Sequence, residues 1–344
     1  MREKKEIEKN ILCLGCDIGT MHICCARSDS DKINTTRNVF LPLDNDNINI
    51  SDLSDLSYVR SEDDELYVIG SDAFKFANIF GKEVSRPMES GLISAKEIDA
   101  IDILTLMLKD LIGDVKDKEA YVSYSVPAEA IDNKRSVTYH ENVFGSIFKT
   151  LGINCTSINE AMAIIYSECV KEHFTGIAIS FGAGMANVAV SYKGTEALTF
   201  STARSGDWID KQVADSLGMV ANRVTGIKEK YMKLTGPIEN KNKKTKRVLE
   251  ALYYYHKALI EYTVKQIIKE FDERIDIEID EKLPIVISGG TSLPTGFTKL
   301  FKEVISGYDI PFEISEIRRA KNPLTAVANG LLIRTISDVK NMAK

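Results

Sequence analysis

The stretch ILCLGCDIGTMHICCA, residues 11–26, joins two apolar runs through the short turn Asp17-Ile18-Gly19-Thr20. The two runs predict a pair of β-strands over residues 11–27. Glycine lets a backbone approach an anion closely, and successive N–H groups in such a turn can hold phosphate oxygens. Asp17 adds an oxygen ligand suited to hydrated Mg²⁺. A single turn of this kind is weak evidence, because any hairpin can use glycine.

The same pattern returns in the second half of the chain. An apolar strand at 176–180 ends in FGAG at 181–184 and is followed by a second strand at 187–192. A third apolar strand, at 283–287, ends in SGGT at 288–291. Helical patterns follow both strand–turn–strand units, so we expect two related α/β halves whose three glycine turns grip a nucleotide from both sides. The chain has neither a GxxxxGK[ST] sequence nor a GxGxxG that opens a helix after its first strand, which disfavours a P-loop enzyme and a Rossmann dehydrogenase.

Hydrophobic periodicity predicts the other elements. Helices are expected at 71–80, 98–112, 135–151, 207–217, 221–234, 248–274 and 323–333, and strands at 65–70, 121–126 and 153–158. Residues 42–64 are polar and rich in Asn, Asp and Ser, which predicts a surface insertion. Residues 236–247 predict a basic, solvated loop; nucleic-acid binding through its KNKKTKR run is the less favoured alternative.

Composition limits the possible classes. The 344 residues carry 44 Lys and Arg against 50 Asp and Glu, a net charge of −6, so a general electrostatic grip on nucleic acid is disfavoured. The length predicts two domains or one two-lobed unit. No stretch approaches the roughly 20 apolar residues that span a bilayer, and residues 1–10 resemble neither a signal peptide nor an amphipathic anchor. We therefore expect a cytoplasmic protein without a clear membrane or nucleic-acid segment.

The six cysteines include a C-x-x-C at Cys13 and Cys16, followed by Cys24 and Cys25. This spacing could indicate a zinc site. However, alternation along a strand places Cys13 and Cys16 on opposite faces. Small buried thiols in a reducing compartment are the favoured interpretation.

Eight segments, taken in order, resemble motifs of the actin/Hsp70 superfamily of ATP-binding proteins, most closely the bacterial actin homologues MreB and MamK. They are LGCDIGT (14–20), RPMESGLIS (86–94), YSVPAEA (124–130), INEAMAIIYS (158–167), SFGAGMANVAVSYKG (180–194), SGDWID (205–210), IVISGGTSLP (285–294) and NPLTAVANG (322–330). The resemblance implies an α/β, actin-like (ribonuclease H-like) duplicated fold of two lobes with an interlobe nucleotide cleft. The first lobe would comprise 11–158 plus 322–344, with a small outer subdomain at 38–85. The second would comprise 159–321, with a reduced helical outer subdomain at 226–271.

The resemblance also implies roles for individual residues. Asp17 would order Mg²⁺ through water, and Gly19 and Thr20 would hold phosphate. Glu160 falls on the family's catalytic carboxylate, which positions the water that attacks the γ-phosphate; the alternative is a helix N-terminal acid that interacts with the helix dipole. Lys228 would lie near the ribose or base, although a solvated helix lysine is the competing interpretation. The full set of expected nucleotide contacts is Gly19, Thr20, Met21, Gly182, Ala183, Gly184, Gly206, Asp207, Lys228, Gly289, Gly290 and Thr291.

The second phosphate motif departs from the family's pattern. Ser180 and Asn187 replace Asp, Met185 and Ala186 replace Thr, and Ser205 replaces Gly. One carboxylate near the metal and two hydroxyl donors are lost, while Gly182 and Gly184 remain. Because phosphoryl transfer depends on electrostatic stabilisation, these losses should slow hydrolysis more than binding.

The favoured hypothesis is therefore an actin-like cytoskeletal protein that binds ATP or ADP with Mg²⁺, polymerises head to tail with itself, and converts ATP and water to ADP and phosphate slowly. The alternative is a non-filamentous actin-fold or Hsp70-like nucleotide-binding regulator. A sugar or acetate kinase of the same superfamily is a weaker third option. An adaptor protein as partner, and the cellular role of a filament, are left open by the sequence.

Overall fold

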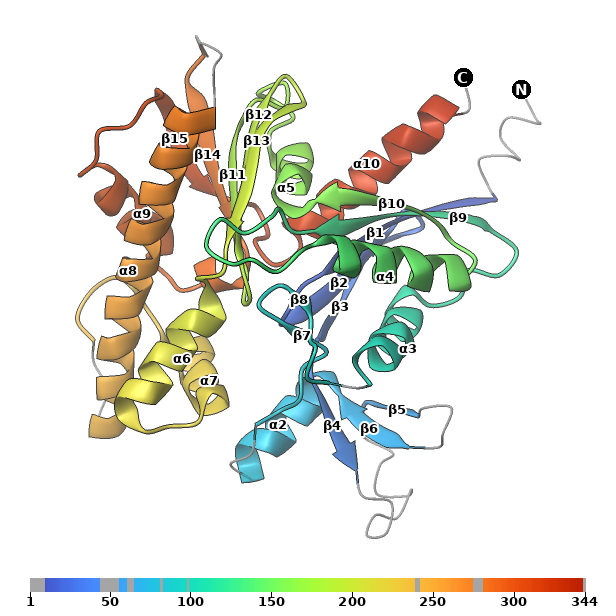
Figure 1. The fold of residues 1–344 in the computed structure, drawn as a ribbon, viewed down its shortest axis with the longest axis horizontal. Coiled ribbons are helices and arrows are strands. Elements are labelled where there is room, and N and C mark those ends of the chain that lie inside the picture. The colour runs from blue at the N-terminus through green and yellow to red at the C-terminus, as the bar shows by residue number, and fades with distance from the viewer. Residues whose placement is uncertain are drawn as a thin grey trace.

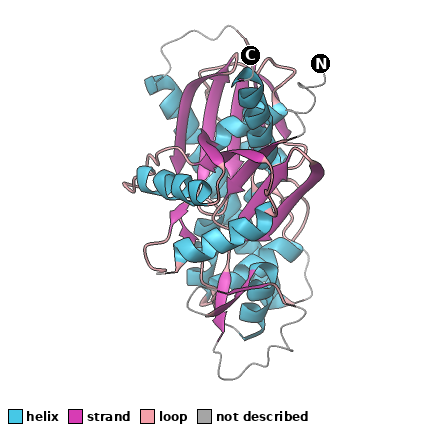
Figure 2. Ribbon diagram, turned by 90° about the vertical axis from the view of Figure 1, so that its right-hand side faces the viewer, coloured by secondary structure: helices cyan, strands magenta, loops and turns pink. Residues whose placement is uncertain are grey.

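The computed structural model describes residues 10–43, 56–60, 65–80, 83–97, 99–238, 242–274 and 281–342. Two five-stranded sheets form its centre, and helices lie beside each of them (Figure 1). A small outer sheet lies at the opposite end of the molecule from the two chain ends, as both Figure 1 and the side view of Figure 2 show.

The two central sheets have the same topology. The first has the order β10-β9-β1-β2-β3 and the second the order β13-β12-β11-β14-β15. In the first sheet, β1, β2 and β3 are antiparallel neighbours, and β1, β9 and β10 run parallel. In the second sheet, β11, β12 and β13 are antiparallel neighbours, and β11, β14 and β15 run parallel. The strands of the first sheet are β1 (Ile11–Ile18), β2 (His22–Arg27), β3 (Ser30–Arg37), β9 (Glu119–Val126) and β10 (Asn154–Asn159). Those of the second are β11 (Gly176–Phe181), β12 (Ala186–Tyr192), β13 (Thr195–Thr202), β14 (Leu283–Ser288) and β15 (Ile314–Arg319). The chain therefore consists of two halves that share one sheet topology.

Two helices join the halves. Helix α5 (Glu160–Glu168) and helix α10 (Ala326–Met342) pack against each other, and in Figure 1 α10 runs from beside α5 to the upper right. Their crossing is very close, because a Cβ atom at Gly330 would overlap the backbone of Ala163. Gly15 of β1 likewise meets the backbone of Ala328. Glycine at these two positions lets α10 pack directly on α5 and on the first sheet.

Helices α3 (Ala100–Ile112) and α4 (Thr138–Thr150) share a hydrophobic core with the first sheet. The outer part of this half contains β4 (Phe40–Leu43), β5 (Tyr58–Arg60), β6 (Leu66–Ile69) and α2 (Gly70–Phe80). Two short strands, β7 (Met88–Glu89) and β8 (Leu92–Ile93), form a hairpin between this part and α3. The predicted insertion at 42–64 lies largely outside the described residues.

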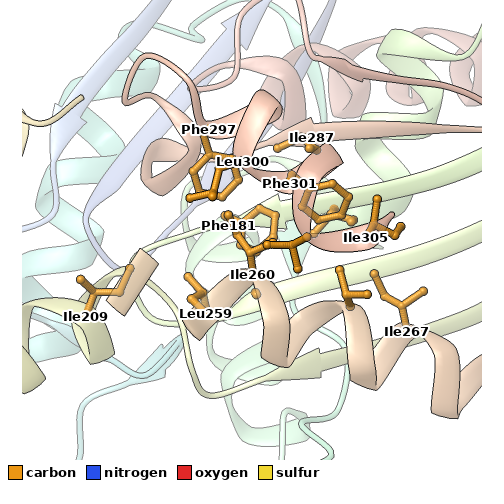
Figure 3. Packing of buried hydrophobic residues seen from close by; sticks show 14 of the residues in the cluster. Phe181, Ile209, Leu259, Ile260, Ile267, Ile287, Phe297, Leu300, Phe301 and Ile305 are labelled. Atoms are coloured by element: carbon orange, nitrogen blue, oxygen red, sulfur yellow. The ribbon is translucent and has the colours of Figure 1, made fainter. Parts of the chain in front are cut away.

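The second half has its own core. Phe181 at the end of β11 contacts Phe297 and Phe301 edge-on, with ring centroids 5.0 and 6.3 Å apart (Figure 3). The other elements of this half are α6 (Gly206–Leu217), α7 (Ala221–Tyr231), α8 (Lys243–Arg274), the 3₁₀ turn η3 (Gly290–Ser292) and α9 (Phe297–Ile305). Outside an isolated bridge at Lys233, the described residues of 226–271 form no strand.

Several predicted boundaries were wrong. Helix α8 begins at Lys243 rather than at 248, because most of the basic run that we assigned to a solvated loop has good helix propensity and forms the first turns. The last helix spans Ala326–Met342 rather than 323–333, and an Arg334–Asp338 ion pair of 2.9 Å supports its extension. The strands β3, β13 and β15 and the helix α9 were not predicted at all. The first three are rich in polar residues and lie at sheet edges, where the alternating apolar pattern weakens.

All six cysteines are free thiols, and the Sγ atoms of Cys16 and Cys25 lie 3.1 Å apart across β1 and β2. The described residues contain no group of three or more His, Cys, Asp or Glu that could hold a metal ion. No helix in the described part of the chain is both long and apolar enough to cross a bilayer. Residues 1–9, which we judged to be neither signal nor anchor, lie outside the described residues.

Candidate functional site

A cavity of about 520 Å³ lies where the two halves meet. This volume falls within the range of small-molecule sites. All residues that the sequence placed at the nucleotide site line it: Asp17, Gly19, Thr20, Met21, Glu160, Gly182, Ala183, Gly184, Gly206, Asp207, Lys228, Gly289, Gly290 and Thr291. The fold therefore brings the three glycine turns together as expected, while the role of each residue in binding stays a prediction.

Several of the polar side chains that line the cavity come from the ends of parallel strands. Asp17 lies near the carboxyl end of β1, Ser125 at that of β9, and Glu160 directly after β10. Ser180 occupies the corresponding end of β11 in the second sheet. Ligands of parallel α/β sheets bind at these carboxyl ends, so the topology itself predicts where the site lies.

Each of the first two turns keeps backbone donors available. Gly19 N–H bonds to the carbonyl of His22, and Gly182 N–H bonds to that of Met185, which closes both turns. Within the described residues, the N–H groups of Thr20 and Met21 and those of Ala183 and Gly184 donate no hydrogen bond. Four free donors that line one cavity suit the oxygens of a polyphosphate.

The carbonyl of Gly182 anchors the second turn to its surroundings. It accepts hydrogen bonds from Ser205 Oγ at 2.6 Å, Thr291 Oγ1 at 2.7 Å and Gly206 N at 3.2 Å. Thr291, one of the expected nucleotide contacts, thus also links the third glycine turn to the second. Ser205, one of the departures from the family's pattern, supplies the shortest of the three bonds.

Asp17 is held by Ser125, a residue that the sequence analysis did not identify. Ser125 Oγ donates to Asp17 Oδ1 at 2.9 Å and accepts from the Ile18 N–H at 2.9 Å. Desolvation raises the pKa of Asp17 to about 6, and the Ser125 hydrogen bond opposes this shift. A bound cation would reverse the shift, because a positive charge favours the carboxylate.

Glu160 is the first residue of α5, but it does not cap the helix. The side chain of Asn159 accepts from the N–H groups of Ala161 and Met162 and is the cap. The Glu160 carboxylate instead accepts from Ser180 Oγ at 2.6 Å and from Asn187 Nδ2 at 2.8 Å. Desolvation and then the nearby charge of Asp17 raise the pKa of Glu160 to about 8, against the hydrogen bond from Ser180.

Lys228 is not a solvated surface lysine. Its side chain is largely buried, and its Nζ lies 2.8 Å from Asp210 Oδ2. Thr225 Oγ1 donates to the same oxygen at 2.6 Å. The other oxygen, Asp210 Oδ1, is buried and has no partner among the described residues. Burial raises the pKa of Asp210, and the charge of Lys228 lowers it.

Contacts between the halves surround the cavity. Arg86 pairs with Asp207 at 2.8 Å, and Arg37 pairs with Glu229. Met185 at the tip of the second turn is buried against Leu92 and Val137 of the first half. In the sequence, Met185 is notable only as a missing hydroxyl, and neither ion pair is predicted. Charged residues far apart in the chain give no local signal of such pairing.

The charged side chains that line the cavity limit the kind of ligand that it can bind. Its lining includes five carboxylates (Asp17, Glu160, Asp207, Asp210 and Glu229) but only two cationic side chains, Arg37 and Lys228. Burial, and the adjacent Arg37, lower the pKa of His22 to about 4, so this ring is neutral. Three of these carboxylates are neutralised by ion pairs with Arg86, Lys228 and Arg37, which leaves Asp17 and Glu160 to face an incoming phosphate. A carboxylate-lined pocket of this kind fits a phosphate that enters with a hard divalent cation, whose preferred ligands are oxygens.

Comparisons with solved structures give the class of the fold. The chain superposes on a MamK double helical filament with a TM-score of 0.72 at 18% identity, covering 95% of this chain and 99% of that one. MreB5 of Spiroplasma citri bound to ADP gives 0.67 at 13%, covering 98% and 99%. The ethanolamine utilization protein EutJ of Carboxydothermus hydrogenoformans gives 0.54 at 17%, covering 94% and 89%. The duplicated sheets and the cavity between the halves thus define an actin-like two-lobed protein.

The family is also established. Residues 12–335 match the model of the Volactin family, and the chain therefore belongs to that family. A search of curated proteins gives no match.

Proposed function

We propose that this protein binds ATP with Mg²⁺ between its two lobes, assembles head to tail into filaments, and hydrolyses ATP to ADP and phosphate slowly. The observation that carries the proposal is the convergence of three glycine turns and the Asp17 and Glu160 carboxylates on one cavity. A MamK filament and an ADP-bound MreB5 with the same fold support it. The first lobe would comprise 11–158 and 322–344, the second 159–321, and the protein would act in the cytoplasm.

Mg²⁺ would be held near Asp17, through water, and would supply charge neutralisation for the phosphates. Asp17 and its partner Ser125 orient that end of the site, and the free N–H groups of the two turns bind phosphate oxygens. Glu160 accepts a hydrogen bond from the attacking water and so orients it.

Slow hydrolysis follows from the second turn. Ser180 brings no charge, and its hydroxyl is already directed at Glu160. Met185 is packed in an apolar cluster between the lobes, and Ala186 lies in the core of the second lobe. Neither side chain donates to a transferring phosphoryl group, so stabilisation in the transition state rests on the backbone and the cation.

Electron microscopy of the purified protein with ATP and Mg²⁺ tests the assembly. Filaments are the expected result, and an equal amount of protein without nucleotide is the control. If the protein binds ATP but no filaments form at any concentration, the second candidate, a non-filamentous nucleotide-binding regulator, replaces the first. The structural likeness to the ethanolamine utilization protein EutJ is the observation that favours this second candidate.

A further inference from the structure

Both oxygens of the Glu160 carboxylate are held by side chains of the second lobe. Ser180 Oγ donates to Oε1 at 2.6 Å, and Asn187 Nδ2 donates to Oε2 at 2.8 Å. The two donors are paired residues on the neighbouring strands β11 and β12, and each is only 1% exposed. Buried side chains on two hydrogen-bonded strands have little conformational freedom. The two donors therefore hold the Glu160 carboxylate in a fixed orientation.

The orientation of the Asn187 amide is fixed independently. Asn187 Oδ1 accepts from the backbone N–H of Ala128 at 3.2 Å. A backbone N–H can only donate, so the oxygen of the amide must face Ala128 and the nitrogen must face Glu160. The carbonyl of Ala128 in turn accepts from Ser201 of β13, which secures the loop after β9.

The residue types at 180 and 187 match this arrangement. A carboxylate at either position would face Glu160 with like charge, or the two groups would have to share a proton. Serine and asparagine instead offer neutral hydrogen-bond donors to the two oxygens of the Glu160 carboxyl group. No Lys or Arg in the described part of the chain makes an ion pair with Glu160, so these hydrogen bonds are what holds it there.

We propose that Ser180 and Asn187 are positioning residues that hold the Glu160 carboxylate as the acceptor for the attacking water. This inference rests on the proposed ATPase function. Each carboxylate oxygen can accept two hydrogen bonds, and Ser180 and Asn187 occupy one site on each. The remaining lone pairs of Glu160, which lines the cavity, are free for water. Ser180 and Asn187, which both depart from the family's pattern, thus bind the same carboxylate and orient it together.

Single-turnover phosphate release tests the proposal. Ser180→Ala and Asn187→Asp should each lower the rate about tenfold or more while the ATP dissociation constant stays within about threefold, because orienting water matters mainly in the transition state. Ser180→Thr, which keeps the hydroxyl, should recover most of the rate. Ser191→Ala is the matched control: Ser191 is a buried serine of β12 whose hydroxyl donates to the Phe174 carbonyl, and its loss should leave the rate unchanged.

A nucleotide-free experiment separates this inference from the proposed function. In the double variant Glu160→Gln with Asn187→Asp, donor and acceptor exchange places, so thermal stability lost in Asn187→Asp should be recovered while turnover is not. Recovery shows that the contact exists whether or not ATP binds. Absence of recovery overturns the proposal, as does a loss of turnover in Ser180→Ala no greater than that in Ser191→Ala. A wild-type protein that binds ATP without hydrolysing it also overturns it, whereas one that binds no ATP overturns the proposed function itself.

Discussion

Gly184 of the second lobe lies directly against Thr20 of the first. A Cβ atom built on Gly184 would overlap Thr20 Oγ1 and the backbone N of Gly91, so only glycine fits between the first two glycine turns. Thr20 Oγ1 also accepts from the Gly91 N–H at 3.0 Å. The two lobes therefore approach closely at the turns themselves, where a side chain would push them apart.

Gly184→Ala should separate the two turns and destabilise the nucleotide-free protein by about 1–3 kcal/mol, the usual cost of overpacking. Gly226→Ala is the control, because nothing lies within 4 Å of a Cβ at this helical glycine. The control should be stabilised by about 0.5–1 kcal/mol. Denaturant unfolding of both variants measures the difference. Equal stability of Gly184→Ala and the wild type would show that the turns do not touch in solution.

Asp17→Ala should weaken ATP binding in the presence of Mg²⁺ by at least about tenfold, because one charge-assisted contact to the hydrated cation contributes on the order of 1.5–3 kcal/mol. Asp215→Ala, an exposed residue of α6, is the control and should bind like the wild type. Calorimetry with and without Mg²⁺ measures both. The difference between variant and wild type should largely vanish when Mg²⁺ is removed. Unchanged affinity of Asp17→Ala would remove this residue from the site.

Glu160→Ala should lower hydrolysis about 10²–10⁴-fold and leave ATP affinity within a few-fold, since a water-positioning group acts mainly in the transition state. Phosphate release in a single turnover gives the first quantity, and calorimetry the second. An unchanged rate would leave Glu160 with a structural role in the contact to Ser180 and Asn187.

The stability of the nucleotide-free protein should fall as pH rises from about 5 to about 8. The folded-state pKa of Asp17 is about 6 and that of Glu160 about 8, both above the values near 4 of an unfolded chain. The folded protein therefore binds more protons than the unfolded chain between these values, and raising the pH removes that stabilisation. Unfolding midpoints across this range measure the slope, and Glu160→Gln should flatten it. A midpoint that rises with pH in the wild type but not in the variant would contradict the prediction.

Filaments should form well before the ATP that they contain is hydrolysed, and they should persist for longer than filaments of a fast ATPase. Because Met185 and Ala186 offer no hydroxyl in the cavity, phosphate release should lag well behind assembly. Light scattering and phosphate release followed in the same sample give the two time courses. The slow-turnover hypothesis fails if phosphate appears as fast as the filaments form.

The duplicated α/β fold and the location of the site could be predicted from local sequence. Apolar runs that end in Asp-Ile-Gly-Thr, Phe-Gly-Ala-Gly and Ser-Gly-Gly-Thr specify strands and turns through a few adjacent residues, and parallel strand ends meet at one edge. Glu160, Asp207 and Lys228 were expected at the site only through the resemblance to actin-like proteins, and they line the same cavity. Elements with weak apolar patterns, such as β3 and β15, gave no comparable signal.

Only the tertiary structure decided which side chains meet. Ser180 and Asn187 read in the sequence as lost charges, yet strand register places both against Glu160. The ion pair of Arg86 with Asp207 joins residues 121 positions apart. Hydrogen bonds and ion pairs depend on distances of about 3 Å, which packing and register set after the strands and helices have formed. Local composition determines the elements, and their assembly determines the chemistry of the site.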